Sequence, residues 1–150
     1  MPQFRTTRRV RHSAADMFNL VADVEKYPQF VPLCERLIVR ERRQEGDAEI
    51  LVADMTVAYG PFRETFTSRV RLSKQANEII VEYVNGPFSH LLNKWSFVPA
   101  GDNVCDVKFF IDWEMKSRLL SMTVGAVFER AFRTFAEAFE QRANRIYQPK

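Results

Sequence analysis

Glu64 is the residue whose position most invites chemistry. It falls in register with the apolar residues Phe62, Phe66 and Val70, and Ser68 shares that register. A carboxylate that faces an otherwise buried surface can have its pKa tuned for acid or base catalysis. The same position suits a hydrogen-bonded structural group, which is the interpretation we favour. No catalytic residue is therefore assigned, and acid–base catalysis by Glu64 stays as the weaker alternative.

Metal and nucleophile chemistry find no support in the sequence. His12 and His90 have no HExxH motif around them and no carboxylate spacing that suggests zinc. Cys34 and Cys105 are too few for a disulfide framework or a zinc knuckle, so we expect buried free thiols. The sequence also lacks a Walker loop, a GxSxG elbow and a glycine-rich dinucleotide fingerprint. We expect no metal site and no required cofactor.

Aromatic residues occupy many of the apolar positions, and the chain contains 13 Phe. Segments 62–72 and 105–115 alternate between apolar and mostly charged residues, a period of two that indicates strands with one face toward a core. The segment 91–99 puts Leu91, Trp95 and Phe97 on one face beside Asn93. Rings on such a face can stack on a flat ligand or simply fill the core.

The elements that would position these residues follow in a simple order. Residues 3–12 have a strand pattern, and Ser13 with Asp16 fits the cap of a short helix that begins at Ala14. Prolines 28 and 32 break up the connection that follows. From Leu33 to Met115, turn residues separate about six strands of an antiparallel meander.

The last segment, from Ser117 to about Tyr147, has helical periodicity. Its apolar residues recur at spacings of three and four, at Leu120, Val124, Phe128, Phe132, Phe135 and Phe139. About 30 residues at a rise of 1.5 Å make a helix of ~45 Å, long enough to cross a whole sheet.

This order of elements predicts an α+β fold of the helix-grip kind, in which a curved antiparallel sheet of about six to seven strands wraps around a long C-terminal helix. One core suffices at this length, so we expect residues 1–150 to form a single domain. Because a twisted sheet curls away from a straight helix, an apolar cavity should remain between them.

The charged residues are expected on the surface of the protein. The formal net charge is +3, a mild excess. Arginines that could form a basic surface for RNA or phospholipid head groups stand at positions 5, 8, 9, 11, 36, 40, 42 and 43. No stretch has the roughly 18 to 20 uninterrupted apolar residues of a membrane span, and no apolar signal-peptide region follows the basic N-terminus.

Four segments resemble the coenzyme Q-binding START-domain family. They are the run from Asp23 to Cys34 (DVEKYPQFVPLC), the triplet Ser68-Arg69-Val70, the triplet Gly86-Pro87-Phe88 with Leu91, Trp95 and Phe97, and the run from Val107 to Leu120. The resemblance covers nearly the whole chain, although Leu33 stands where the family has Trp. It implies a START-like fold. The family's bacterial branch includes proteins called ribosome association toxins, and the wider superfamily contains polyketide cyclases.

The resemblance implies a protein that binds ubiquinone or a related isoprenoid lipid, supports respiration or ubiquinone biosynthesis, and performs no established chemical step. The alternative is a ribosome-binding inhibitor of translation, the toxin of a toxin–antitoxin pair, with a cyclase-like enzyme as the weaker reading. We expect a bacterial cytoplasmic protein, with peripheral contact to the inner membrane and ribosome contact through the basic surface among its interactions. The candidate ligand-binding residues are Phe30, Phe66, Phe88, Trp95, Phe97, Phe109, Trp113, Val124, Phe128 and Phe132.

Overall fold

Seven antiparallel strands form one sheet in the computed structural model, which describes residues 3–147. The strands are β1 (Gln3–Val10), β2 (Cys34–Glu45), β3 (Ala48–Tyr59), β4 (Phe62–Ser73), β5 (Glu78–Asn85), β6 (Phe88–Gly101) and β7 (Val104–Met115). Their order across the sheet is β1-β7-β6-β5-β4-β3-β2. The predicted α+β helix-grip fold, with a meander of six strands after the first helix, is confirmed.

The first strand in the sequence, β1, forms one edge of the sheet beside the last strand, β7. β1 pairs only with β7, with Phe4 opposite Ile111 and Val10 opposite Cys105. The remaining strands pair with their neighbours in sequence. The short connections between alternating segments predicted this meander, whereas the partner of β1 is set by tertiary packing.

A short helix, α1 (Ala14–Ala22), begins where the cap was predicted. The Ser13 hydroxyl accepts a hydrogen bond from the Asp16 backbone N–H at 3.0 Å, which satisfies one of the free donors of the first turn. The helix buries Met17, Phe18 and Val21. It is followed by a 3-10 helix, η1 (Val24–Gln29), which contains Pro28 and forms the predicted broken connection.

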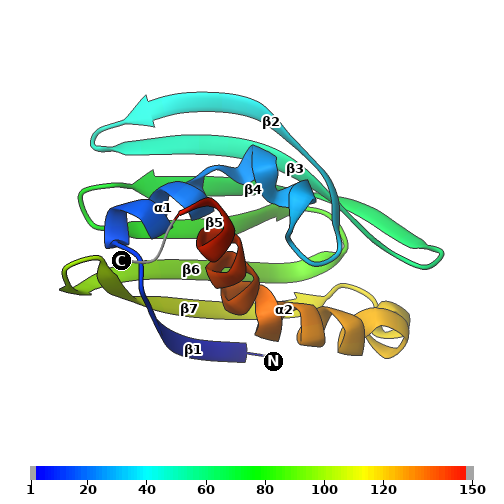
Figure 1. The fold of residues 1–150 in the computed structure, drawn as a ribbon. Coiled ribbons are helices and arrows are strands. Elements are labelled where there is room, and N and C mark those ends of the chain that lie inside the picture. Colours follow the sequence, from blue (N-terminus) through cyan, green and yellow to red (C-terminus); the bar gives the residue numbers. More distant parts are fainter. Residues whose placement is uncertain (1–2, 148–150) are drawn as a thin grey trace.

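The long helix α2 (Arg118–Ile146) crosses one face of the sheet (Figure 1). Its N-cap is Ser117, whose hydroxyl accepts from the Leu120 N–H at 3.3 Å. Residues Val124, Phe128, Phe132 and Phe139 are buried on the sheet side, as the periodicity predicted. The backbone of α2 approaches β7, β1 and α1 closely, and it stays farther from β2, β3 and β4. Figure 1 shows β2 and β3 arching away from the helix.

The alternation of β7 is confirmed throughout, since Cys105, Val107, Phe109, Ile111, Trp113 and Met115 are all buried. On β4, Ser68 is buried as expected but Glu64 is exposed. The expected inward position of Glu64 is therefore wrong. The physical reason is that β5 covers β4 only from Thr67 onward, so the beginning of β4 pairs with β3 alone and projects beyond the core.

The eight arginines of the predicted basic surface do not form one patch, because β1 and β2 lie at opposite edges of the sheet. Five of them also pair with carboxylates: Arg8 with Glu140, Arg9 with Asp106, Arg40 with Asp54, Arg42 with Glu25 and Glu49, and Arg43 with Glu41 and Glu45. Sequence periodicity carries no information on strand order, so it could not separate the two groups. The surface expectation is corrected to two smaller basic edges.

The turn between β5 and β6 requires glycine. Gly86 has a φ of +146°, and an added Cβ would lie 2.4 Å from the Cβ of Phe66. The next residues lock the turn in place, because the Phe88 backbone N–H donates to the Tyr83 hydroxyl at 3.1 Å. The Gly-Pro-Phe triplet is thus a hairpin connection with a positive φ that packs directly onto β4.

Replacing Gly86 with alanine tests this close approach. Gly101 is the matched control, because its φ of +143° is nearly the same while nothing lies within 4 Å of an added Cβ. We expect Gly86→Ala to lower the free energy of unfolding by about 1–3 kcal/mol more than Gly101→Ala in urea denaturation. Equal losses in the two variants would show that the φ angle alone, and not the contact with Phe66, demands glycine.

Candidate ligand-binding cavity

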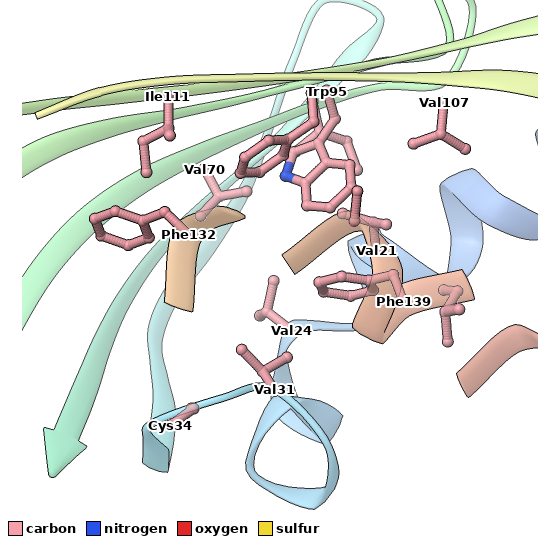
Figure 2. Close-up of a cluster of buried hydrophobic side chains, with 14 of the residues drawn as sticks. Val21, Val24, Val31, Cys34, Val70, Trp95, Val107, Ile111, Phe132 and Phe139 are labelled. Atoms are coloured by element: carbon pink, nitrogen blue, oxygen red, sulfur yellow. The ribbon is translucent and has the colours of Figure 1, made fainter. Parts of the chain in front are cut away.

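A cavity lies between α2 and the part of the sheet that the helix does not reach. The space that the centres of water-sized molecules can occupy in it is about 80 Å³, and the cavity is partly open to solvent. Figure 2 shows Trp95 and Ile111 projecting from the sheet toward Phe132 and Phe139 of α2, with Val24 and Val31 on a third side. The lining residues are Val24, Tyr27, Val31, Pro32, Leu33, Leu37, Ala53, Met55, Val57, Phe66, Ser68, Val70, Val81, Leu91, Asn93, Trp95, Ile111, Phe128, Ala131, Phe132, Phe135 and Phe139.

The wall of the cavity is almost entirely apolar. Among residues 3–147, no Asp, Glu, Lys, Arg or His lines it. Two of its polar side chains are already engaged by the protein. The Tyr27 hydroxyl donates to the Val21 carbonyl at 2.5 Å. The Asn93 amide donates to the Phe110 carbonyl at 2.9 Å and accepts from the Trp95 ring N–H at 2.9 Å.

Ser68 differs from the other polar wall residues. Its side chain is buried on the inner face of β4, and its hydroxyl makes no hydrogen bond to any residue between 3 and 147. The hydroxyl oxygen is not among the fully buried polar atoms that lack a partner, so it keeps some exposure inside the cavity. The Ser68 hydroxyl is therefore free to bond a polar atom of a molecule inside the cavity.

Burial keeps the side chains of Tyr27, Cys34 and Cys105 in their neutral forms. Burial raises the pKa of the Tyr27 phenol, which remains protonated. Burial also raises the pKa of Cys34 and of Cys105 to about 11, so both side chains are thiols rather than reactive thiolates near neutral pH. The expectation of two buried free cysteines is confirmed. Within the described range, no group of three or more His, Cys, Asp and Glu side chains could hold a metal ion.

Four of the ten candidate ligand-binding residues line the cavity: Phe66, Trp95, Phe128 and Phe132. They come from β4, β6 and α2, and the fold brings them to one cavity. The Trp113 ring packs behind Phe132, with their centroids 5.3 Å apart. This contact fixes a wall residue from the side of the sheet.

The other six candidates do not line the cavity. Phe88, Phe97, Phe109 and Trp113 form a layer of buried rings behind the wall, and Val124 is buried on α2 one turn before Phe128. Phe88 packs against the rings of Phe66, Tyr83, Trp113 and Phe128. Phe30 lies outside the wall, where its ring contacts Tyr27 and Phe139 on one side and the Arg142 guanidinium on another.

Most of the wall escaped the sequence analysis. The missed residues are mainly aliphatic side chains of the η1–β2 connection and of β3, such as Val31, Leu33, Met55 and Val57. The β3 segment reads as a nearly continuous apolar run, so alternation could not assign its inner face. Phe135 and Phe139 belonged to the predicted apolar stripe of the last helix, and that stripe was the available signal for them.

None of the helices described between residues 3 and 147 combines the length and apolarity needed to cross a membrane.

Several known proteins are similar to this chain in sequence or in structure. The family model described as polyketide cyclase / dehydrase and lipid transport matches residues 10–140. The ribosome association toxin RatA of Escherichia coli K12 is 33% identical over 150 residues, spanning 100% of this chain and 92% of the toxin. The mitochondrial coenzyme Q-binding protein COQ10 of Drosophila melanogaster is 32% identical over 143 residues, spanning 93% of this chain and 57% of that protein. A solution structure of an 18 kDa protein from Caulobacter crescentus has a TM-score of 0.78 at 34% identity, with 98% of this chain and 99% of that chain covered.

A comparison of Phe88 with Phe135 tests the distinction between the filled core and the cavity wall. Phe88 is fully buried among four rings, whereas Phe135 lines the cavity and is only partly buried. We expect Phe88→Ala to lower the free energy of unfolding by about 3–5 kcal/mol. Phe135→Ala should cost clearly less, because part of its ring already faces unfilled space. Urea denaturation of both variants measures the difference, and equal losses would mean that the cavity is packed core in solution.

Proposed function

This chain belongs to the polyketide cyclase / dehydrase and lipid transport family, and from that premise we propose that it binds an elongated apolar ligand of the isoprenoid-quinone class. The observation that carries the proposal is the cavity wall, which has no charged side chain among the described residues and one uncommitted hydroxyl. Apolar, preformed cavities with a few placed polar groups are suited to lipid-like molecules.

Different residues of the wall are proposed to contact different parts of the ligand. We assign ligand contact to the rings of Phe66, Trp95, Phe128 and Phe132, which line the space. The Ser68 hydroxyl is placed to donate to a carbonyl oxygen of a quinone head group. The aliphatic side chains of β3, including Met55 and Val57, would contact the isoprenoid part. The remaining five buried candidates, Phe88, Phe97, Phe109, Trp113 and Val124, act through the wall residues that they support.

We propose that this binding involves no chemical step. General acid–base catalysis needs a titratable group within hydrogen-bond reach of the ligand. The wall contains Tyr27 as its only side chain with an ionisable proton among the described residues, and that hydroxyl is bound to a carbonyl while burial raises its pKa. Glu64, the candidate for a cyclase-like reaction, is exposed outside the cavity.

A second candidate function is association with the ribosome. It is favoured by the match to RatA, which spans nearly the whole of both chains, whereas the match to COQ10 spans 57% of that protein. As a cellular role, the relatives thus support inhibition of translation better than support of respiration. The two proposals use different parts of the molecule, because the cavity is internal and ribosomal RNA would meet the surface. Arg11 and Arg36, at the two edges of the sheet, form no ion pair with a described residue.

Ligand-linked stability tests the first proposal. A ligand that binds only the folded state raises the free energy of unfolding by about 2.7 kcal/mol at roughly a hundredfold excess over Kd. We expect a short-chain ubiquinone to raise the Tm of the wild-type protein. Ser68→Ala should lose about 0.5–1.5 kcal/mol of the stabilisation, the usual contribution of one hydrogen bond. Ser96→Ala, at an outward position of β6, is the control that should keep the full increment.

Extraction of the purified protein with organic solvent, followed by absorbance and mass spectrometry, tests the same proposal without added ligand. A folded protein that carries no lipid and whose Tm does not respond to ubiquinone would contradict it. An increment that Ser68→Ala and Ser96→Ala reduce equally would remove the assigned role of Ser68 alone.

Cosedimentation with ribosomal subunits tests the second candidate. Because contacts with phosphates release counterions, we expect binding at low salt that weakens steeply as salt rises. An Arg11→Gln/Arg36→Gln variant should reduce the salt dependence, whereas Arg43→Gln, which removes a cation already paired with two carboxylates, is the matched control. If the wild-type protein does not travel with either subunit at low salt, ribosome association has to be abandoned.

A further inference from the structure

The first turns of α2 carry an apolar surface that nothing in the described fold covers. Met122 is 78% exposed and Leu119 is 69% exposed, the highest values among the large hydrophobic residues of the described chain. The two residues are three positions apart and therefore lie on the same side of the helix, with the exposed Ala126 one turn further on. The opposite side of the same turns buries Val124 and Phe128. This part of α2 is thus apolar on both its inner and its outer side.

Positive charge borders this surface at the start of the helix. Lys116 and Arg118 are exposed and form no ion pair with any residue between 3 and 147. The sequence contains no acidic residue from Met115 to Phe128. Beyond that point the outer side of α2 becomes charged, with Glu129 and Arg133 paired to each other. The apolar surface therefore ends where the helix turns polar, and its immediate charge is positive.

The surface adjoins the cavity. Figure 1 places the start of α2 and the turn between β3 and β4 at the same end of the molecule. Tyr59, at the end of β3, is 52% exposed beside this turn. The Phe62 ring, just after the turn, packs edge-on against Phe128 with the centroids 5.8 Å apart. Since Phe128 lines the cavity, one pair of rings connects the exposed end of the molecule to the cavity wall.

We propose that the first turns of α2 and the β3–β4 turn form a docking surface for an anionic phospholipid bilayer, through which the ligand enters. This inference rests on the proposed binding of an isoprenoid ligand and names where such a ligand is collected. Apolar side chains enter the boundary between head groups and acyl chains, and neighbouring cations bind anionic head groups. Tyr59, with an apolar ring and a polar hydroxyl, suits the same boundary. Leu119, Met122, Lys116 and Arg118 supply this combination.

The charge selects a bilayer over a second copy of the chain. A symmetric dimer built on this surface would bring two copies of Lys116 and Arg118 into one interface, and the segment 115–128 supplies no carboxylate to pair with them. An anionic membrane provides the complementary charge and an apolar phase at once. Docking at this end also brings the Phe62–Phe128 contact close to the membrane. When the two rings separate, the acyl region of the bilayer is connected with the cavity.

Flotation with lipid vesicles tests the docking surface on the whole protein. The vesicles contain either phosphatidylcholine alone or phosphatidylcholine with phosphatidylglycerol. We expect the wild-type protein to bind the anionic vesicles and to bind neutral ones much more weakly. Leu119→Ser/Met122→Ser should weaken binding roughly tenfold or more, because two apolar side chains no longer enter the bilayer. Lys116→Gln/Arg118→Gln should lose the preference for anionic vesicles and the sensitivity to salt.

The matched control is Ile146→Ser, which removes a 50% exposed apolar side chain at the other end of the same helix and should leave vesicle binding unchanged. Full binding by the Leu119→Ser/Met122→Ser variant would overturn the proposal. So would a concentration-dependent dimer of the wild-type protein, seen by sedimentation equilibrium and lost in that variant, since the surface would then join two copies. Ubiquinone added from solution should still raise the Tm of the docking variant. A Tm that does not respond in any variant marks failure of the ligand proposal, separately from failure of docking.

Discussion

The placement of one long helix against a curled sheet is the constraint on which the rest of the structure depends. Aromatic contacts anchor α2 on the β6–β7 side, where Phe139 packs against Trp95 and Phe132 packs against Trp113, with centroids 4.9 and 5.3 Å apart. A helix fixed there cannot also approach β2 and β3, which arch away from it. Twist accumulates from strand to strand, so the separation grows toward that edge of the sheet. The cavity is the direct result of this geometry and needs no special segment to form it.

The helices, strands and their inward faces could be predicted from the sequence because periodicity reports local geometry. The apolar residues of β7 and α2 obey their periods along the whole element, and the Ser13 cap marks the start of α1 at the residue expected. The depth of each residue could not be predicted in the same way. Trp95 and Phe97 share one face of β6, yet only Trp95 borders the cavity. That distinction depends on where α2 lies relative to the sheet, which is a tertiary property.

The two errors have the same origin. Glu64 follows the inward register of β4, but β5 pairs with β4 only from Thr67 onward, so at Glu64 this register points into solvent. The arginines of β1 and β2 look like one group in composition, and the strand order places them at opposite edges. The apolar wall of the cavity and the charged edges of the sheet consequently consist of different residues in different parts of the fold. Carboxylates already neutralise many of the outer cations, and such exposed pairs contribute little to stability.

The pairing of β1 with β7 also governs how the chain reaches its fold. Gln3 lies opposite Asp112, so more than a hundred residues separate partners that must meet to complete the sheet, and α2 follows every strand in the chain. Contacts of such long sequence separation slow folding, because the entropy of closing a large loop is lost before the contact forms. During synthesis the aromatic inner faces of β4, β6 and β7 emerge before the helix that covers them. The nascent chain therefore passes through a stage with an open, apolar sheet, and its folding is completed only when the last helix docks.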